Sequence, residues 1–351
     1  MAHARSIEEL YEVLEVSLKA SPEVLHAAFR ALMAKHHPDP PNRTEADEER
    51  AKEVSEAYAV LSDPRARARY EHRFRDLTGK IVGEYRILAK IAEGGFGCTY
   101  KAEHMTIGEP VCIKHCHNLD PFDEAILIEE AKAMWDLRHY SVPAVRGLLR
   151  MPDGKLALVM SYIPGPTLTQ LVEKLSENSR RLDPEHVAWV TERVLNALRY
   201  IHYQGIVHGD LKPHNIIVEP DKHLASVVDF GLSKIKPKAK SGSKGYTEFF
   251  SAPEVIAGGT ILPEADMYSL GMTMIYALSG DPDCLLRKEV PTNTPLPMQK
   301  FIKKLIVRDP LSRPKWPSSP NEMDLWDEFL EIRRESFGRS RSSLKPIPGF
   351  N

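Results

Sequence analysis

Two short stretches of this chain bring carboxylate, amide and amino groups close together: residues 208–215 (HGDLKPHN) and residues 229–231 (DFG). Transfer of a phosphoryl group from ATP requires an acceptor for the proton of the attacking hydroxyl, a cation beside the phosphates and oxygen ligands for magnesium. Asp210 can accept the proton, and Lys212 can supply the cation. Asn215 and Asp229 carry oxygen atoms of the kind that magnesium prefers. These residue types at this spacing therefore predict phosphoryl transfer.

A glycine-rich segment lies upstream, after a strand-like stretch at residues 85–88. It runs over residues 91–97 (IAEGGFG), and glycines let a backbone lie close to phosphates and direct N–H groups at them. A second short strand is expected at residues 111–114, and it ends in Lys114. A helix with two glutamates follows. This order predicts a nucleotide-binding half in front of the catalytic half.

A helix is expected to deliver the chain to the 208–215 loop. Asp183 caps its start, apolar residues repeat at helical spacing, and Gly205 ends it. The most apolar run of the chain, residues 267–278, is about a dozen residues long and is shorter than the ~20 that a membrane helix needs. It is expected to be a buried helix.

From about residue 82 to residue 333, these motifs together resemble the eukaryotic-type protein kinase fold. Later residues continue the pattern. The resemblance implies that Asp266 (in DMYSLG) holds the catalytic loop, and that Arg313 (in RDPLSRP) forms a buried ion pair with Glu254 (in APE). The DLKPHN sequence, with Thr247 seven residues before Glu254, implies Ser or Thr acceptors rather than Tyr.

The resemblance also assigns roles to individual residues. Glu130, nine residues before His139, is preferred to Glu129 as the partner of Lys114. The implied catalytic residues are Asp210, Lys212, Lys114 and Glu130. The implied Mg²⁺ ligands are Asn215 and Asp229. The residues implied around ATP are Ala92, Gly94, Gly95, Gly97, Thr99, Cys112, Lys114, Ser161, Ile163 and Ile217.

Within the ATP site, Thr99 and Cys112 would lie above the adenine and Ile217 below it. Backbone groups of residues 161–163 would bond the base, and Met160 would limit the pocket behind it. Two positions depart from the family pattern, because Ala92 replaces the first loop glycine and Thr99 replaces a valine. Neither change removes a charged group, so a lower ATP affinity is expected rather than none.

Two further observations concern charge and metal binding. Gly209 stands where most kinases have an arginine that receives the activation-segment phosphate, so activity independent of that phosphorylation is expected. Lysines in the activation segment could steer an acidic peptide, although a solvated loop is preferred. Strand alternation places Cys112 and Cys116 on one face and His115 and His117 on the other, which disfavours a zinc site.

The N-terminal 70 or so residues show a different pattern. A helix starts at the SPE sequence of residues 21–23 and must end near His36, because Pro38 restricts the residue before it. Two more helices follow, with YAVLSDP at residues 58–64 between them. The HPD sequence of residues 37–39 lies in the loop after the first of these helices, and with these flanks the region resembles the J domain of DnaJ-type cochaperones. The residues implied to contact a DnaK-type chaperone are His37, Pro38, Asp39, Arg30 and Lys35. A helical module that only binds or positions another molecule is the alternative.

The expected organisation is a multidomain α+β chain in which a small all-α J domain precedes a bilobal protein-kinase fold. The boundaries are a J domain at 5–72, a short linker at 73–81, a kinase domain at 82–333 and a flexible tail at 334–351. The chain has 351 residues, a net charge of -2 and four cysteines without paired spacing. A cytoplasmic protein is therefore expected, without nucleic-acid or membrane partners.

The expected function is Mg²⁺-dependent transfer of the ATP γ-phosphate to Ser or Thr of protein substrates, coupled to a J domain that engages a DnaK-type chaperone. One alternative is a cochaperone adaptor whose kinase-like half only binds nucleotide, and another is a small-molecule kinase. The complete set of charged and amide groups opposes the adaptor. The APE sequence and its Arg313 partner oppose the small-molecule kinase.

Overall fold

The structure is a computed structural model, and it describes residues 9–36, 45–73, 77–93, 97–116, 121–151, 154–235, 249–317, 319, 322–338 and 347. The chain divides into two compact units. The first contains Met1–Glu124 and Leu149–Ala157, and the second contains Ala125–Leu148 and Leu158–Asn351.

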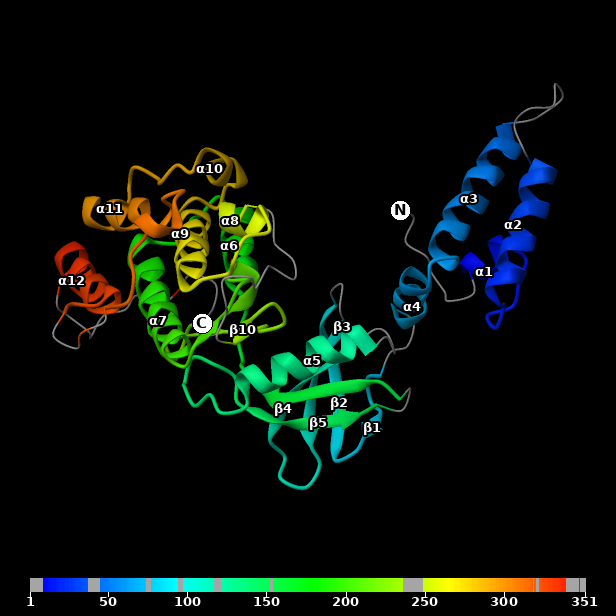
Figure 1. The fold of residues 1–351 in the computed structure, drawn as a ribbon, viewed down its shortest axis with the longest axis horizontal. Helices are drawn as coiled ribbons and strands as arrows, with labels where there is room; N and C mark the ends of the chain where they lie inside the picture. The colour runs from blue at the N-terminus through cyan, green and yellow to red at the C-terminus, as the bar shows by residue number, and fades with distance from the viewer. Residues whose placement is uncertain are drawn as a thin grey trace. The chain divides into compact units, whose positions relative to one another are not determined.

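The described part of the N-terminal region contains four helices: α1 (Glu9–Val13), α2 (Pro22–His36), α3 (Glu45–Leu61) and α4 (Pro64–Arg73). The last three were expected from the sequence, and α1 was not. The hydroxyl of Ser21 accepts from the N–H of Val24 at 3.5 Å, so the predicted cap of α2 is present. The predicted end of this helix at His36 is also confirmed. Helices α2 and α3 lie side by side (Figure 1).

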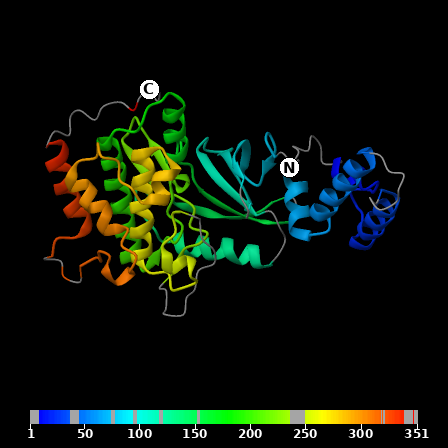
Figure 2. The ribbon, with the colours of Figure 1, turned by 90° about the horizontal axis from the view of Figure 1, so that it is seen from above.

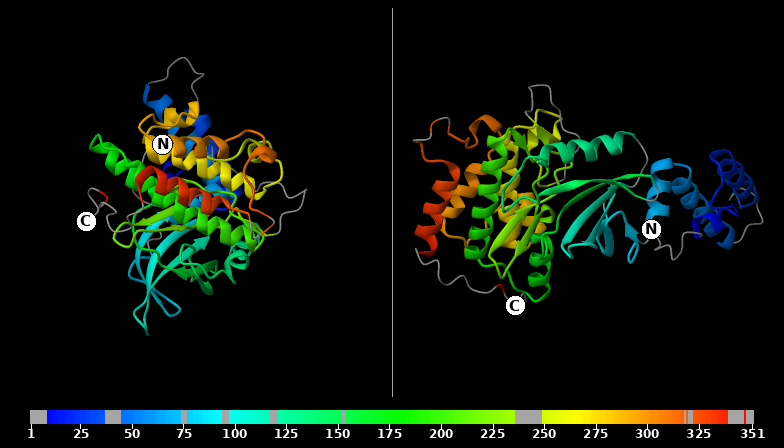
Figure 3. Two further views of the ribbon diagram at one scale, coloured as in Figure 1. Left: turned by 90° about the vertical axis from the view of Figure 1, so that its left-hand side faces the viewer. Right: turned by 90° about the horizontal axis from the view of Figure 1, so that it is seen from below.

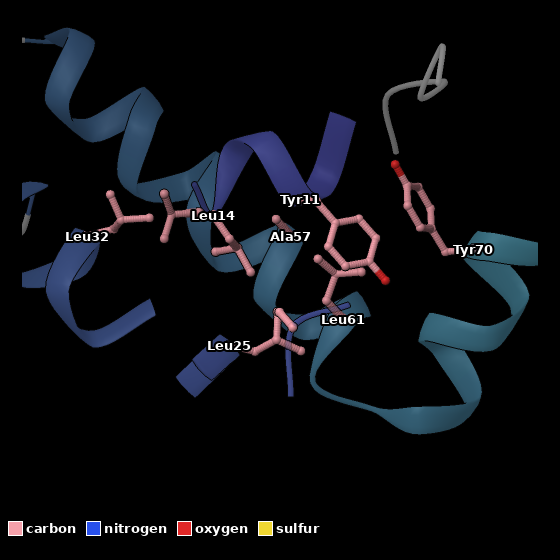
Figure 4. Packing of buried hydrophobic residues seen from close by; sticks show 9 residues of the cluster. Tyr11, Leu14, Leu25, Leu32, Ala57, Leu61 and Tyr70 are labelled. Atoms are coloured by element: carbon pink, nitrogen blue, oxygen red, sulfur yellow. The ribbon is translucent and has the colours of Figure 1, made fainter. Parts of the chain in front are cut away.

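The core of this helical region comes from apolar residues of all four helices and of the segment between α1 and α2. Leu14, Leu25, Val54, Ala57 and Leu61 are each at most 1% exposed. Figure 4 shows several of them packed together with Tyr11. Burial of the leucine and valine side chains stabilises a fold by roughly 1.5–3 kcal/mol each.

Arg67 of α4 anchors this helix to the start of the chain. Its Nε donates to the Tyr11 hydroxyl at 2.8 Å and to Glu71 Oε1 at 3.0 Å. Its terminal nitrogens donate to the carbonyls of Ala20 (2.8 Å) and Leu18 (3.0 Å). Burial, followed by the hydrogen bond to Glu71, raises the pKa of Tyr11 to about 12, so the phenol stays protonated and donates to Glu71.

Replacing Arg67 with Met should therefore destabilise the helical region by about 2 kcal/mol, because charged hydrogen bonds of this kind contribute ~1.5–3 kcal/mol. Hydrogen exchange of the full chain should accelerate in α4 and in the loop after α1, while the exchange of α9 in the second unit stays unchanged. Arg65→Met is the matched control, because Arg65 is exposed on the same helix. Equal protection of α4 in the two variants would contradict the anchoring role.

A six-stranded sheet follows, and Figure 2 shows its curled strands in cyan and green. Its order is β1-β2-β3-β4-β6-β5. The strands are β1 (Ile81–Val82), β2 (Tyr85–Glu93), β3 (Gly97–His104), β4 (Pro110–Cys116), β5 (Val145–Arg150) and β6 (Leu156–Ser161). Strands β1 to β4 pair antiparallel with their neighbours in turn. Along β3, buried side chains alternate with half-buried ones, so the two faces of the sheet differ.

The predicted linker of residues 73–81 is too long at both ends. Helix α4 continues through Arg73, and Ile81 already pairs with Arg86 in the sheet. The N–H of Gly79 donates to the carbonyl of Ile87 at 2.8 Å, and the N–H of Ile87 donates to the carbonyl of Lys80 at 2.9 Å. Gly79 has a φ of 81°, a conformation that glycine adopts without strain and that turns the chain onto β2.

The second unit is mainly helical, and it contains all four tryptophans of the chain: Trp135, Trp189, Trp316 and Trp326. Its helices are α6 (Leu168–Glu177), α7 (Pro184–Tyr203), α8 (Pro253–Ile256), α9 (Pro263–Ser279), α10 (Pro282–Arg287), α11 (Leu296–Leu305) and α12 (Leu325–Phe337). Helix α5 (Pro121–Met134) begins in the first unit and continues into this one. Short strands and turns complete it: β7 (Ile206–Val207), η1 (Pro213–Asn215), β8 (Ile216–Glu219), β9 (Leu224–Val227), β10 (Lys234–Ile235) and η2 (Pro310–Ser312).

Helices α7 and α9 form the centre of this unit. The carboxylate of Asp183 accepts from the N–H of Glu185 at 2.9 Å, and Gly205 follows the helix with a φ of 75°. The predicted helix before the catalytic loop is therefore confirmed. The apolar run at 267–278 forms most of α9, which is buried along nearly its whole length and packs against α7 and α11. Among the described residues, no helix combines the length and apolar character needed to cross a membrane.

The prediction of a flexible tail from residue 334 is wrong at its start. Helix α12 extends to Phe337; Asp324 caps its first turn, and its residue Phe329 is fully buried. In Figure 3 this red helix is seen with the green α7, against which it packs. Ile347 is also buried, at 2% exposure. Residues 339–346 and 348–351 lie outside the described part of the chain.

Candidate active site

The predicted catalytic residues of the 208–215 loop lie close together. The Nζ of Lys212 is 2.7 Å from Oδ2 of Asp210. The amide nitrogen of Asn215 donates to the same oxygen at 3.2 Å and to the backbone carbonyl of Asp210 at 2.9 Å. Two donors on one oxygen orient the buried Asp210 carboxylate. Because the NH₂ group of Asn215 is engaged, its amide oxygen is the atom that could face a metal ion.

Short secondary structures fix the ends of this loop. Strand β7 pairs antiparallel with β10, and η1 ends at Asn215, whose backbone carbonyl accepts from the N–H of Val228 at 2.9 Å. His208 fills the space between, with Nε2 3.1 Å from the carbonyl of Val228 and Nδ1 accepting from the N–H of Asp210 at 3.3 Å. His208 is thus a neutral imidazole that carries its proton on Nε2.

Asp266 of α9 binds the backbone of the 208–215 loop, as the resemblance to protein kinases implies. Its carboxylate accepts from the backbone N–H groups of His208 and Gly209, each at 2.8 Å, and lies 2.8 Å from Nε2 of His202. Burial alone would raise the pKa of Asp266, but the hydrogen bonds from His202 and Gly209 hold this pKa below its usual value. The loop is therefore held by a carboxylate that is charged at neutral pH.

Gly209 has a φ of 77°, a left-handed conformation that suits glycine and costs other residues about 1–2 kcal/mol. A Cβ at this position would lie 3.0 Å from the carbonyl oxygen of Leu232 and 3.5 Å from Cδ1 of Ile261. The backbone conformation and the nearby Leu232 carbonyl therefore both favour glycine at position 209. This is a separate effect from the loss of the arginine that would receive a phosphate.

Replacing Gly209 with Ala should lower the free energy of unfolding by more than the ~1–2 kcal/mol of left-handed strain, and it should also lower kcat. Gly258→Ala is the matched control, since Gly258 has a φ of 76° but a methyl group on its Cα would meet no atom within 4 Å. Urea unfolding and turnover of both variants separate backbone strain from the contact with Leu232. Equal effects of the two changes would show that the contact is unimportant.

The 229–231 segment follows β9 after one residue, Val228. Asp229 is exposed, has a φ of 66° and accepts from the N–H of Gly231 at 3.4 Å. The N–H of Phe230, between these two residues, donates to Oε1 of Glu130 at 3.2 Å. Glu130 is 2% exposed, whereas Glu129 is exposed and pairs with Lys132, so the structure favours Glu130 as the residue directed toward this segment.

Four of the predicted ATP contacts share one face of the sheet. Thr99 lies opposite Lys114 in the β3–β4 register, and Lys101 lies opposite Cys112. Ala92 of β2 lies opposite Thr99. Directly opposed residues of antiparallel strands point to the same side, so Ala92, Thr99, Cys112 and Lys114 line one face. Half-buried Thr99, Cys112 and Lys114 lie on this face, whereas His115 and Cys98 are buried on the other one.

The remaining ATP-site predictions fall on the segment after β6 and on β8. Ser161 and Ile163 are half-buried, and so is Ile217 of β8. The N–H of Ser161 already donates to the carbonyl of Ala144 at 2.8 Å, so this N–H is not the group that would bond an adenine. Met160 is 8% exposed. Gly97 opens β3, while Gly94 and Gly95 lie outside the described residues.

Arg313 and Glu254 form the predicted ion pair. The two terminal nitrogens of Arg313 donate to the two carboxylate oxygens of Glu254 at 2.6 and 2.7 Å. Arg313 also donates to the carbonyls of Val307 (2.7 Å) and Arg308 (2.9 Å). Its side chain is fully buried, while that of Glu254 keeps 19% exposure, so the pair is less buried than predicted. Thr247 lies outside the described residues.

In the helical region, the predicted chaperone contacts Arg30 and Lys35 are exposed on α2. His37, Pro38 and Asp39 lie outside the described residues. Sequence reasoning missed His202, which is almost fully buried beside Asp266; a histidine within an otherwise apolar helix face was its only signal. It also missed the hydrogen bond between Thr169 Oγ1 and Nδ1 of His214, at 3.1 Å, for which the sequence has no local sign.

Comparison with known proteins agrees with this geometry. The protein kinase domain family matches residues 85–331, and the DnaJ domain family matches residues 9–71. The chain is 30% identical over 220 residues to the serine/threonine-protein kinase pkn3 of Myxococcus xanthus. The aligned region is 58% of this chain and 39% of that protein. The chain is 30% identical over 245 residues to the serine/threonine-protein kinase PAK mbt of Drosophila melanogaster, covering 64% and 37%. It is 28% identical over 271 residues to the maternal embryonic leucine zipper kinase of Danio rerio, covering 73% and 36%.

The chain thus spans less than two-fifths of the length of these relatives. The protein kinase family match covers most of the chain. The matched residues include the Asp210 carboxylate with its donor Lys212, the catalytic loop bound by Asp266, and the Arg313–Glu254 ion pair. This family implies the use of ATP and Mg²⁺. The chain belongs to the protein kinase family, with a serine/threonine-type kinase domain behind an N-terminal DnaJ domain.

Proposed function

We propose that this protein transfers the γ-phosphate of ATP to Ser or Thr hydroxyls of protein substrates with the help of Mg²⁺. The observation that carries the proposal is the Asp210 carboxylate, bound at Oδ2 by Lys212 and Asn215 on a loop that Asp266 clamps. An adaptor that only binds nucleotide would have no need for this arrangement of proton acceptor and cation.

Each residue has a role that follows from its position. Asp210 orients the substrate hydroxyl and takes its proton. Lys212, 2.7 Å away, offsets negative charge on the transferred group. Lys114, on the same face as Thr99 and Cys112, holds the α- and β-phosphates. When bound, Mg²⁺ would neutralise phosphate charge, and the donor set of one carboxylate (Asp229) and one amide oxygen (Asn215) suits it.

The test is incorporation of label from γ-labelled ATP into a generic protein substrate and into the chain itself, with magnesium. We expect incorporation with the wild type and its loss with Asp229→Asn, which removes a metal-binding carboxylate but keeps the side-chain size. Asp283→Asn is the control, since Asp283 is an exposed acid at the start of α10. Background incorporation by the wild type and the variant alike would reject the enzyme and favour the nucleotide-binding adaptor.

We also propose that the DnaJ domain engages a DnaK-type chaperone and stimulates its ATPase. The family match over residues 9–71 and the exposed Arg30 and Lys35 on α2 support this proposal. The full chain should accelerate ATP hydrolysis by such a chaperone, and His37→Gln should not. An Asp229→Asn background removes the chain's own ATP turnover from the assay. Equal rates of chaperone ATP hydrolysis with the wild type and with His37→Gln would reject this proposal. They would favour a helical module that only binds or positions another molecule.

Regulation and location are two further parts of the proposal. We propose that turnover does not depend on phosphorylation of the activation segment, because Gly209 offers no side chain to receive a phosphate; phosphatase treatment should leave the rate unchanged. We propose a cytoplasmic location, which the four cysteines without paired spacing support and which cell fractionation can test.

A further inference from the structure

Trp316 forms a hydrogen bond that the site described so far does not explain. Its indole Nε1 lies 2.7 Å from Nδ1 of His202 on α7, at a separation of 114 residues in the chain. An indole N–H can only donate, so Nδ1 of His202 must accept. A neutral imidazole that accepts at Nδ1 carries its proton on Nε2. Trp316 therefore selects one tautomer of His202.

The selected tautomer faces the carboxylate that holds the catalytic loop. Nε2 of His202 lies 2.8 Å from Oδ2 of Asp266, and both side chains are only 1% exposed. The same carboxylate accepts from the N–H groups of His208 and Gly209, the two residues that precede Asp210. A continuous chain of hydrogen bonds thus runs from Trp316 to the backbone of the catalytic loop.

The alternative tautomer would be unfavourable at this place. With the proton on Nδ1, the lone pair of Nε2 would face the negative charge of Asp266, and the Nδ1 proton would face the N–H of Trp316. Both contacts are repulsive, and the low local dielectric strengthens such terms. The Asp266 carboxylate and the Trp316 N–H therefore favour the same tautomer, and the Trp316 N–H is the contact, among those described, that keeps a proton off Nδ1.

The segment that carries Trp316 is itself well anchored. Arg313, three residues earlier, binds Glu254 through two hydrogen bonds and also donates to the carbonyl of Glu264 at 3.0 Å. Pro314 and Pro317 limit the backbone on either side of Trp316. The indole ring lies 6.0 Å from the His202 ring and 6.4 Å from the Tyr203 ring. Trp316 is therefore a fixed donor rather than a mobile surface side chain.

We propose that Trp316 is a positioning residue for phosphoryl transfer, which acts through His202 and Asp266 on the loop that carries Asp210. This inference rests on the proposed kinase activity. It assigns Trp316 no contact with substrate or nucleotide. Its effect is to keep the backbone N–H groups of His208 and Gly209 on Asp266, so that the carboxylate of Asp210 stays in place during turnover.

The test is Trp316→Phe in the full chain, which keeps an aromatic ring and removes only the N–H and the second ring. We expect kcat to fall about tenfold, as for the loss of one hydrogen bond of a charged network, with an unchanged KM for ATP. Nitrogen NMR of histidine-labelled protein should show a protonated Nε2 and an unprotonated Nδ1 for His202 in the wild type. The variant should show a proton on Nδ1 in part of the molecules, with Nε2 still protonated against Asp266, because the donor that excludes a proton from Nδ1 is gone.

Trp189→Phe is the matched control. Trp189 lies on the same helix as His202 and is 2% exposed, and its Nε1 has no hydrogen-bond partner among the described residues. Its replacement removes the same atoms from a buried site, so it should change stability but neither kcat nor the His202 signals. A similar fall in kcat for both variants would assign the effect of Trp316 to packing.

The outcomes separate this inference from the proposed function. A wild type without any transfer activity rejects the kinase proposal, whatever the tautomer is. An active wild type whose His202 carries its proton on Nδ1 overturns the inference, even if Trp316→Phe fails to fold. An active variant with the wild-type kcat and an unprotonated Nδ1 overturns it too, and so does a lower kcat with an unprotonated Nδ1.

Discussion

Asp210→Asn should lower kcat by about 100- to 10,000-fold, which is the range that a positioned general base contributes. The amide keeps the size of the carboxylate and can still accept from Lys212, but it cannot take the proton of the substrate hydroxyl. The KM for ATP should remain unchanged, because Asp210 is expected to touch the acceptor rather than the nucleotide. Steady-state kinetics with varied ATP measures both quantities.

The control for this change is Asp221→Asn, since Asp221 is an exposed acid in the turn between β8 and β9. It should show wild-type kinetics. Circular dichroism of both variants verifies that the fold is retained. If Asp210→Asn keeps more than a tenth of the wild-type kcat, Asp210 is not the proton acceptor, and the chemistry assigned to the loop needs another base.

Arg313→Leu should destabilise the second unit by ~3–5 kcal/mol, the cost of leaving the partner of a buried ion pair without its counter-charge. The change leaves Glu254 and the carbonyl of Val307 without the donors that they have in the structure. The effect falls toward the lower end of the range because Glu254 keeps 19% exposure and can be hydrated. Urea denaturation followed by circular dichroism measures it.

Arg287→Leu is the comparison for Arg313→Leu. Arg287 pairs with Glu289 at 3.1 Å, but both side chains are more than half exposed, and exposed pairs contribute little to stability. The urea midpoint of this variant should match that of the wild type. A wild-type midpoint for Arg313→Leu would show that the pair with Glu254 serves specificity of the fold rather than its stability.

The sequence predicted the parts of the site whose residues follow one another closely. Asp210, Lys212 and Asn215 lie within six residues, and their contacts require only that the loop closes on itself. The Glu254–Arg313 and Asp266 predictions succeeded over longer separations because the family resemblance supplied them. The bond from Trp316 to His202 had no such support, since neither residue belongs to a recognised motif.

Element ends were less predictable than element types. Composition suggested a loose tail from residue 334, but the cap at Asp324 and the buried Phe329 keep α12 helical to Phe337. Similarly, the residue type at position 209 was visible, but its left-handed backbone and the nearby Leu232 carbonyl were not. Such features depend on tertiary contacts that a local pattern does not contain.

The distribution of tryptophan has a practical consequence for spectroscopy. All four indoles lie in the second unit, and the DnaJ-type helices contain none. Intrinsic fluorescence excited at the indole band therefore reports on the catalytic part of the chain without any labelling. If a chaperone without tryptophan is added, a change in emission can come only from that part. Tryptophan fluorescence can therefore test whether chaperone binding at the DnaJ domain changes the conformation of the catalytic part of the chain.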